Sequence, residues 1–251
     1  MSLPETEPVV TLEEVSTRLV PGREDHAPLA RVSLRVQPGQ IYALLGAKGA
    51  GKSDLLRLLA GRLMPVAGLI RYGLSLGQSN EARAHNIGYC AQRPELAPDL
   101  SVHDHLSLFA AIAKLPEADR APRIERVARQ LGLVESLDDL VESETAGVQQ
   151  RLHVALSMLH SPLLWLLDEP FVGLDEAAQE TLWRALAEHR SQGGAAVVVC
   201  SDFKHVEESA DWVWMVSRGR LLHEARPHDL VRDHGSIARA LVAITGDGSL
   251  D

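Results

Sequence analysis

Apolar and polar residues alternate early in the chain and then give way to a continuous apolar run. In residues 31–45, RVSLRVQPGQIYALL, the alternation ends at Val36, a Pro-Gly turn follows, and the apolar run begins. Alternation predicts a half-buried antiparallel strand, and the continuous run predicts a strand buried on both faces. Leucines with helical spacing follow at 55–59, before Gly61, which is a suitable helix end. We therefore expect strand, turn, strand, loop and helix in 31–61.

The middle of the chain has the periodicity of helices. The residues SVHD at 101–104 match a capping box, a side-chain arrangement that starts many helices. Apolar residues recur at i, i+3, i+4 and i+7 from Ile124 to Leu131, and Gly132 follows them. We therefore expect a helical segment over roughly 100–160.

Strand-like apolar runs return in the last third of the chain. They occupy 163–167, 195–200 and 212–216, with a helical stretch around 176–191. This order predicts a parallel α/β core with a helical insertion. Each run is far shorter than the ~20 residues of a membrane-spanning helix, so we do not expect the chain to cross a bilayer. In the tail, 228–244 fits a short amphipathic helix that packs on the domain.

Composition and charge narrow the class of protein. The chain has 251 residues, 45% of them hydrophobic and 24% charged, which is an ordinary balance for a folded protein. Its formal net charge of −9 argues against a general nucleic-acid-binding surface. The cysteines, Cys90 and Cys200, are too few for a disulfide framework and fit a reducing compartment. The acidic start, MSLPETEPVV, lacks the pattern of a signal peptide.

A glycine-rich segment at 46–53, GAKGAGKS, has the spacing of a phosphate-binding loop. Between a strand and a helix, such a loop points backbone N–H groups at a phosphate, and the helix N-terminus adds positive potential. Lys52 can reach the β- and γ-phosphates, and the Ser53 hydroxyl can bind Mg²⁺. The candidate nucleotide-binding residues of this segment are Gly46, Ala47, Lys48, Gly49, Ala50, Gly51, Lys52, Ser53 and the adjoining Asp54.

A second candidate element is LLWLLDEP at 163–170, an apolar strand that ends in a pair of carboxylates. Asp168 can hold Mg²⁺ or its water, and Glu169 can polarise an attacking water. An Asp-Glu pair after a strand often only caps the next helix. Together with the phosphate loop, however, the pair predicts nucleotide hydrolysis.

In the order of its motifs the chain resembles the nucleotide-binding domain of ABC transporters over nearly its whole length. The matching segments are the phosphate loop, YCAQRPELAPDLSVHDHL at 89–106, a signature region ending in QQR at 149–151, LLWLLDEP, and GLD at 173–175. The segment 89–106 and RGRLL at 218–222 most resemble ATPases of the ABC-2 export type. Among these, the chain is most similar to the first nucleotide-binding domain of exporters that carry two such domains in tandem.

This resemblance implies a P-loop NTPase fold of the RecA-like kind, an α/β fold with a parallel-sheet core, an antiparallel β subdomain and an inserted helical subdomain. The expected ATPase domain covers 1–228, with its core at about 1–95 and 160–228 and its helical subdomain at about 96–159. Residues 229–251 are the expected C-terminal tail. The implied cofactors are ATP and Mg²⁺.

The resemblance also implies roles for individual residues. Ser53, Gln92 and Asp168 would bind the metal, Gln92 would bind nucleotide and sense a membrane subunit, and Glu169 would be catalytic. The residues implied to lie at a dimer interface are Thr145, Ala146, Gly147 and Gln150 of the signature, which face the partner's nucleotide, and Gly173, Leu174 and Asp175 of the D-loop. The implied partners are an integral-membrane permease and a second nucleotide-binding domain, in a heterodimer or in tandem, and no nucleic acid. The implied location is cytoplasmic, peripheral on the inner face of the plasma membrane.

The signature and the switch position depart from the family pattern. Residues 144–151 read ETAGVQQR where the family has Leu-Ser-Gly-Gly-x-x-Gln-Arg. Thr145 keeps a hydroxyl, whereas Ala146 adds a methyl group where the family's backbone approaches the nucleotide closely. The position of the family's switch histidine, ten residues before Asp211, holds Ser201.

Smaller differences concern His205, Leu19 and Asp54. His205 lies four residues beyond Ser201 and fits a solvated helix residue. No Phe or Tyr stands near Leu19, where the family stacks an aromatic side chain on adenine. Asp54 replaces a Thr or Ser near the α-phosphate. If its charge is not compensated, it would repel the phosphate by roughly 1–4 kcal/mol. Alternatively, it could cap the helix or pair with Arg57 at i+3. We therefore expect weakened nucleotide binding and weak intrinsic ATPase activity.

Several functional interpretations fit these patterns. The leading hypothesis is the ATP-binding subunit or domain of an ABC exporter, acting as the degenerate half of an asymmetric pair. A second is a non-hydrolysing interaction module that regulates a partner. A soluble ABC protein on ribosomes or DNA is disfavoured by the acidic balance and the lack of basic clusters. A small-molecule P-loop kinase would explain the loop but not the order of Gln92, QQR and GLD.

Overall fold

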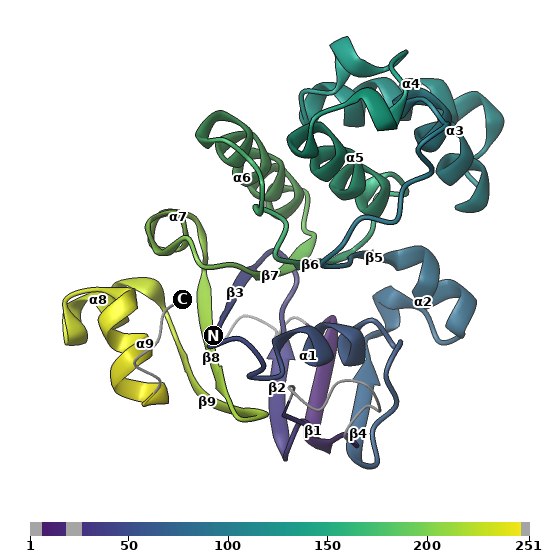
Figure 1. The fold of residues 1–251 in the computed structure, drawn as a ribbon. Helices are drawn as coiled ribbons and strands as arrows, with labels where there is room; N and C mark the ends of the chain where they lie inside the picture. The colour runs from purple at the N-terminus through teal and green to yellow at the C-terminus, as the bar shows by residue number, and fades with distance from the viewer. Residues whose placement is uncertain (1–6, 19–26, 247–251) are drawn as a thin grey trace, which may run out of the picture.

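Within residues 7–18 and 27–246, which this computed structural model describes, six strands form one mainly parallel sheet (Figure 1). They are β3 (Ile41–Leu45), β5 (Ile87–Cys90), β6 (Leu164–Asp168), β7 (Ala195–Val199), β8 (Trp212–Ser217) and β9 (Arg220–Ala225). Their order across the sheet is β5-β6-β7-β3-β8-β9. Neighbours are parallel from β5 to β8, and β9 is antiparallel to β8. The predicted strands at 163–167, 195–200 and 212–216 are β6, β7 and β8.

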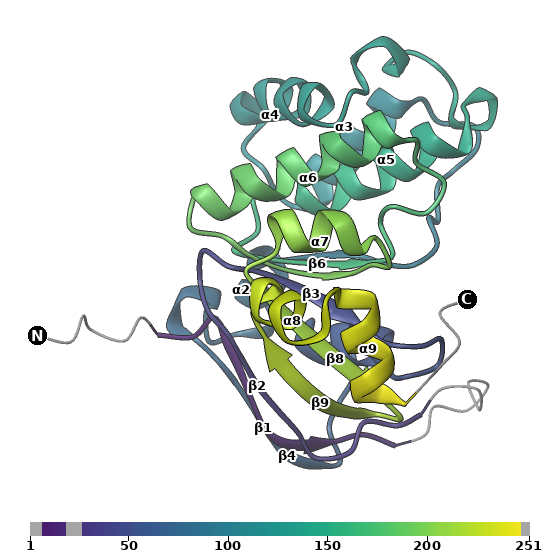
Figure 2. The ribbon, with the colours of Figure 1, turned by 90° about the vertical axis from the view of Figure 1, so that its left-hand side faces the viewer.

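The helices of the middle of the chain lie together above this sheet (Figure 2). They are α3 (Val102–Ile112), α4 (Glu117–Gln130) and α5 (Ala146–Met158), with the short 3₁₀ helices η2 (Val134–Ser136) and η3 (Val141–Ser143) between α4 and α5. The predicted capping box is confirmed, because the Ser101 hydroxyl accepts from the Asp104 N–H at 3.0 Å and the Asp104 carboxylate accepts from the Ser101 N–H at 3.3 Å. The helical insertion is thus where its periodicity predicts it.

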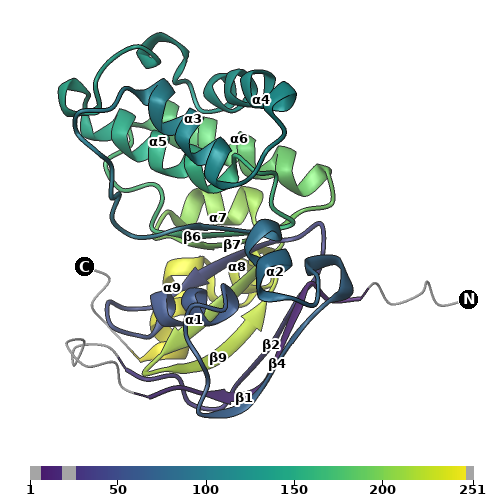
Figure 3. The ribbon, with the colours of Figure 1, turned by 90° about the vertical axis from the view of Figure 1, so that its right-hand side faces the viewer.

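An antiparallel sheet lies on the opposite side of the main sheet from these helices. It consists of β1 (Val10–Ser16), β2 (Val32–Val36) and β4 (Ala67–Tyr72), with β1 in the middle. The helix α1 (Lys52–Leu59) lies between the two sheets (Figure 3). Its leucines are fully buried in one hydrophobic cluster with residues of both sheets. The spacing of these leucines therefore explains why the helix packs there.

The strand β3 is held between two hydrophobic clusters. Ile41, Ala43 and Leu45 belong to the cluster that contains residues of α3, α4 and α5. Tyr42 and Leu44 belong to the cluster that contains the leucines of α1. Successive side chains of a strand point to opposite faces, so a continuous apolar run is needed to fill both clusters. The loop that follows β3 therefore begins at a rigid position in the centre of the molecule.

The C-terminal residues form two helices where the sequence predicts one, α8 (Pro227–His234) and α9 (Ile237–Thr245). α8 ends at Gly235, which has a φ of 80°, and Ser236 caps α9 through its side chain. The tail residues in the main core cluster are Leu230, Ile237, Ala240 and Leu241. The tail thus packs on the core, and the expected boundary between 228 and 229 falls inside α8.

The predicted fold class is confirmed: a parallel-sheet α/β core, an antiparallel β subdomain and an inserted helical subdomain. The remaining helices are η1 (Leu74–Leu76), α2 (Asn80–Asn86), α6 (Glu176–Ser191) and α7 (Phe203–Ser209). In the described part of the chain, no helix combines the length and the apolar character that a membrane span requires.

Candidate functional site

The phosphate loop connects β3 to α1 and folds back on its own lysine. The Lys52 ammonium donates to the carbonyl oxygens of Gly46 at 2.7 Å and Ala47 at 2.9 Å. A Cβ at Gly46 would lie 2.1 Å from the carbonyl oxygen of Val216, so only glycine fits there. Burial lowers the pKa of Lys52, while the negative charges of Glu169 and Asp168 oppose that shift. The loop therefore holds a partly buried cation in the place where a phosphate would bind.

The other candidate residues follow strands on the same side of β3 in the main sheet. Gln92 follows β5, Glu169 follows β6 and Ser201 follows β7, and the strand order β5-β6-β7-β3 places these segments side by side. Carboxyl ends of parallel strands share one edge of a sheet, where ligands of α/β proteins bind. A cavity of about 640 Å³ at this edge is lined by Gly46, Ala47, Lys48, Lys52, Gln92, Glu169 and Ser201. The structure thus brings together residues that are far apart in the sequence.

The catalytic candidate Glu169 is oriented by its backbone and by Gln92. The Gln92 Nε2 donates to the Glu169 Oε2 at 2.9 Å. Glu169 has a φ of 53°, a left-handed conformation that costs about 1–3 kcal/mol in a residue other than glycine. Its N–H donates to the carbonyl oxygen of Val199 at 3.1 Å, which ties this turn to β7. The carboxylate therefore faces the cavity from a fixed position.

The side chains near Lys52 fit Mg²⁺ bound together with a nucleotide. The expected metal ligands Ser53, Gln92 and Asp168 offer oxygen atoms, the donors that Mg²⁺ prefers. Among the described residues, no group of three or more His, Cys, Asp or Glu side chains could hold a metal by itself. Mg²⁺ sites usually combine one or two carboxylates with water and substrate phosphates. The site therefore fits a metal that arrives with its nucleotide.

Asp54 pairs with Arg57. The Arg57 Nη1 lies 3.0 Å from the Asp54 Oδ1, and the Asp54 side chain is only 3% exposed. Of the alternatives that the sequence leaves open, the structure contains the pair at i+3. The carboxylate is thus compensated, and Asp54 lies outside the residues that line the cavity.

Ser201 and His205 differ in exposure, and His205 is less solvated than expected. Ser201 is exposed at the cavity wall. The His205 side chain is 16% exposed, hydrogen-bonded to the Asp202 carboxylate and stacked on Trp183 with ring centroids 6.0 Å apart. The expectation of a solvated residue is therefore wrong, because the aromatic face of Trp183 covers the ring.

The signature residues lie outside the cavity lining. Thr145 caps α5, where its hydroxyl accepts from the Val148 N–H at 3.3 Å, and Ala146 is the first residue of that helix. Gln150 is buried and donates to the carbonyl oxygen of Pro170 at 3.1 Å. This hydrogen bond connects the signature helix to the segment that follows Glu169.

The D-loop also lies outside the cavity lining. Gly173 has a φ of 79°, and Leu174 is buried. Asp175 caps α6 by accepting from the Ala178 N–H at 2.8 Å. The expected adenine contact near Leu19 falls outside the described residues.

Part of the cavity wall and a second groove are not indicated by the sequence. Leu241 and Thr245 of α9 line the nucleotide cavity, although nothing in the tail sequence indicates such a position. A groove of about 960 Å³ lies between α2, β5, α3 and α5, and both neighbours of Gln92, Ala91 and Arg93, line it. Ile112 is 64% exposed at this groove. Gln92 therefore lies between the cavity and the groove.

Comparisons with known proteins agree with this geometry. The family model described as ABC transporter matches residues 29–172. The Nod factor export ATP-binding protein I of Cupriavidus metallidurans is 31% identical, and the match covers 89% of this chain and 73% of that protein. The probable multidrug ABC transporter ATP-binding protein YbhF of Escherichia coli is 30% identical over 82% of this chain, but only 36% of that protein is covered. The cholesterol transporter ABCA5 of Rattus norvegicus is 34% identical over 76% of this chain and 12% of its own length.

Solved structures show the same architecture. The structure of an ATP-binding subunit of an ABC transporter superposes with a TM-score of 0.80 at 25% identity, covering 94% of this chain and 99% of that one. A nucleotide-free ATP-binding cassette superposes with a TM-score of 0.77 at 15% identity, covers 95% of this chain and 99% of that one, and supports the fold alone. The chain therefore belongs to the ABC transporter family, and its fold is that of the family's ATP-binding domain.

Proposed function

We propose that this chain is the ATP-binding component of an ABC exporter and powers or regulates transport through a separate membrane permease. The observation that carries the proposal is the cavity that joins Lys52, Gln92 and Glu169 at the ends of β3, β5 and β6. Relatives named for Nod factor export and for multidrug transport support an export role.

The residues of the cavity and the adjoining Ser53 and Asp168 divide the chemistry of ATP hydrolysis among them. Lys52 and the amides of the loop bind phosphates, and Ser53, Gln92 and Asp168 would hold Mg²⁺, which offsets phosphate charge when bound. Glu169 accepts a proton from the attacking water, a contribution on the order of 10² to 10⁴ in rate. The hydrogen bond from Gln92 orients that carboxylate. Slow hydrolysis is expected because Ser201 lacks the imidazole of the switch histidine.

We further propose that the second nucleotide-binding domain differs from this one. In a homodimer, each composite site would combine Ser201 with the altered signature Thr145–Ala146–Gly147. In a heterodimer or a tandem chain, Ser201 affects the site on this chain's own loop, and the altered signature faces the partner's nucleotide. The defects then fall in different sites, which leaves each site with one unaltered side.

The groove beside Gln92 is the proposed contact with the permease. Its wall combines the apolar Phe109 and Ile112 with the charged Arg93 and Lys114. A surface of this kind suits the end of an amphipathic helix. Because Gln92 lies between groove and cavity, a partner in the groove would act on the residue that holds Glu169.

ATP turnover by the purified chain, alone and mixed with a candidate partner domain, tests this function. We expect weak turnover alone, stimulation by the partner, and loss of nucleotide binding in Lys52→Ala. Strong cooperative turnover by the chain alone would contradict the asymmetric pair. Single-turnover hydrolysis with the partner's catalytic glutamate neutralised then tests Glu169, since Glu169→Gln should lower the residual rate further. An unchanged rate would favour the alternative, a non-hydrolysing regulatory module.

A further inference from the structure

The nucleotide cavity contains a second lysine besides Lys52. Of the described residues that line the cavity, those with charged side chains are Lys48, Lys52, Glu169 and Asp202. The Lys52 ammonium is already held by the carbonyl oxygens of its own loop. A nucleoside triphosphate brings several negative charges into this space. The position of the second ammonium group, that of Lys48, therefore determines where the negative charge of the terminal phosphate is best compensated.

The cavity carboxylates are each engaged with a neighbouring side chain. Glu169 accepts from the Gln92 amide at 2.9 Å. Asp202 caps α7, where its carboxylate accepts from the His205 N–H at 3.3 Å and is hydrogen-bonded to the His205 ring. Each carboxylate therefore has a hydrogen-bond partner other than Lys48.

Lys48 is exposed on the phosphate loop, and its ammonium makes no hydrogen bond or ion pair with any residue in the described ranges 7–18 and 27–246. It lines the same cavity as Ser201, the position where the family places an imidazole. A lysine side chain is a flexible four-carbon stem that ends in a compact point charge, so it can follow a phosphate without a fixed partner.

We propose that Lys48 binds the terminal phosphate of the nucleotide and supplies the charge-assisted hydrogen bond that the neutral Ser201 hydroxyl does not provide. This inference rests on the proposed ATP-binding function and deepens it, because it assigns the distinction between triphosphate and diphosphate to Lys48. The phosphate loop then performs a task that the switch segment performs elsewhere in the family.

Calorimetric titration of Mg-ATP and Mg-ADP into Lys48→Ala tests the assignment. A charge-assisted hydrogen bond to the terminal phosphate predicts that ATP affinity falls about tenfold or more. ADP affinity should change by less than about threefold, because only screened long-range attraction is lost. The matched control is Lys204→Ala, which removes an exposed lysine of α7 outside the cavity lining and should leave both affinities unchanged.

An equal loss of ATP and ADP affinity in Lys48→Ala, or no loss of either, would overturn the proposal. Lys48→Ala combined with Ser201→His should regain the preference for ATP, since an imidazole at 201 would donate into the same cavity. An unrestored preference would overturn the claim that both positions serve one phosphate. Lys52→Ala distinguishes failure of the nucleotide site from failure of the Lys48 proposal. Unchanged ATP binding in Lys52→Ala would reject both the nucleotide site and the Lys48 proposal. Lost ATP binding in Lys52→Ala, together with an unchanged preference for ATP in Lys48→Ala, would reject the Lys48 proposal alone.

Discussion

At the scale of single residues, Asp54 shows how burial decides between interpretations that a sequence leaves open. Spacing alone permits a helix cap, a pair with Arg57 or a charge beside phosphate. The carboxylate is 3% exposed and its partner guanidinium 25% exposed, so water screens the pair little. Asp54 therefore contributes to the stability of α1 rather than to the charge of the cavity.

Asp54→Thr should lower the free energy of unfolding by about 1–3 kcal/mol, because Arg57 loses a buried charged partner. Urea denaturation followed by circular dichroism measures the change. Asp229 on α8 is a matched control, since it also pairs at i+3 with an arginine, at 2.8 Å, but is 40% exposed. Asp229→Thr should cost less than about 1 kcal/mol. Tighter ATP binding by Asp54→Thr would instead show that the carboxylate acts on the phosphate.

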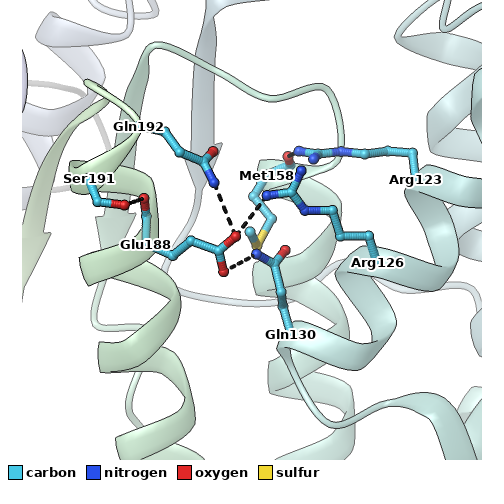
Figure 4. Close-up of polar contacts among 7 residues, drawn as sticks. All are labelled: Arg123, Arg126, Gln130, Met158, Glu188, Ser191 and Gln192. Carbon is cyan, nitrogen blue, oxygen red and sulfur yellow. Dashed lines mark hydrogen bonds and ion pairs between the residues drawn. The ribbon is translucent and has the colours of Figure 1, made fainter.

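At the scale of elements, Glu188 connects the helical insertion to the core (Figure 4). From α6 it accepts hydrogen bonds from Arg126 at 2.7 Å and Gln130 at 2.6 Å, both on α4, and from Gln192 at 3.0 Å. Hydrogen bonds from Gln130 and Arg126 lower the pKa of the Glu188 carboxyl. Arg123, also on α4, donates to the carbonyl oxygens at the end of α5. The position of α4 thus depends on both α5 and α6.

Glu188→Ala should loosen α4 with little effect on the rest of the fold. Glu188 is 42% exposed and Arg126 47% exposed, so the global loss should stay below about 1 kcal/mol. Amide hydrogen exchange should accelerate in α4 and remain unchanged in β3 and β6. Glu180→Ala, an exposed glutamate on the same helix, is the matched control. Equal exchange of α4 in all proteins would show that Glu188 does not hold it.

The sequence predicts the elements better than the contacts between them. Periodicity identifies β3, β6 and α6 almost to the residue, because the two strands are buried on both faces and the helix is buried on one. The break between α8 and α9 depends on Gly235 and Ser236, which the apolar spacing of the tail conceals. The bond between Glu188 and Arg126 joins residues 62 positions apart, so it exists only once the insertion has folded onto α6. Local patterns contain no information on such contacts.

At the scale of the whole molecule, half-buried histidines hydrogen-bond to backbone carbonyl groups in or next to strands of the main sheet. His153 and His160 hydrogen-bond with the carbonyl oxygens of Ala91 at 2.9 Å and Ile87 at 3.3 Å, and His189 hydrogen-bonds with that of Ala195 at 3.1 Å. Burial lowers the pKa of each imidazole below its ordinary value of 6.5. Each is therefore neutral in the folded protein at pH values where the unfolded chain is already protonated.

Stability should accordingly fall as the pH drops through about 6.5. The unfolded chain then binds more protons than the folded one, and each histidine contributes at most about 1.4 kcal/mol per pH unit. Urea unfolding at pH 7.5 and 5.5 measures the slope. His153→Gln should flatten it, whereas His228→Gln, at an exposed position, should not. The same slope in both variants and in the wild type would contradict the assignment.

The strand order at the nucleotide cavity also bears on how such a site can change over generations. Backbone hydrogen bonds hold neighbouring strands about 4.8 Å apart whatever side chains their loops carry. The loops after β5, β6, β7 and β3 therefore keep their positions when one of them exchanges a residue. The position of a loop and the reactivity of its side chains can thus change independently. A protein of this fold can therefore lose reactive groups one at a time and still bind the same partners. By the same reasoning, a single loop can be exchanged between relatives without moving the loops on either side of it.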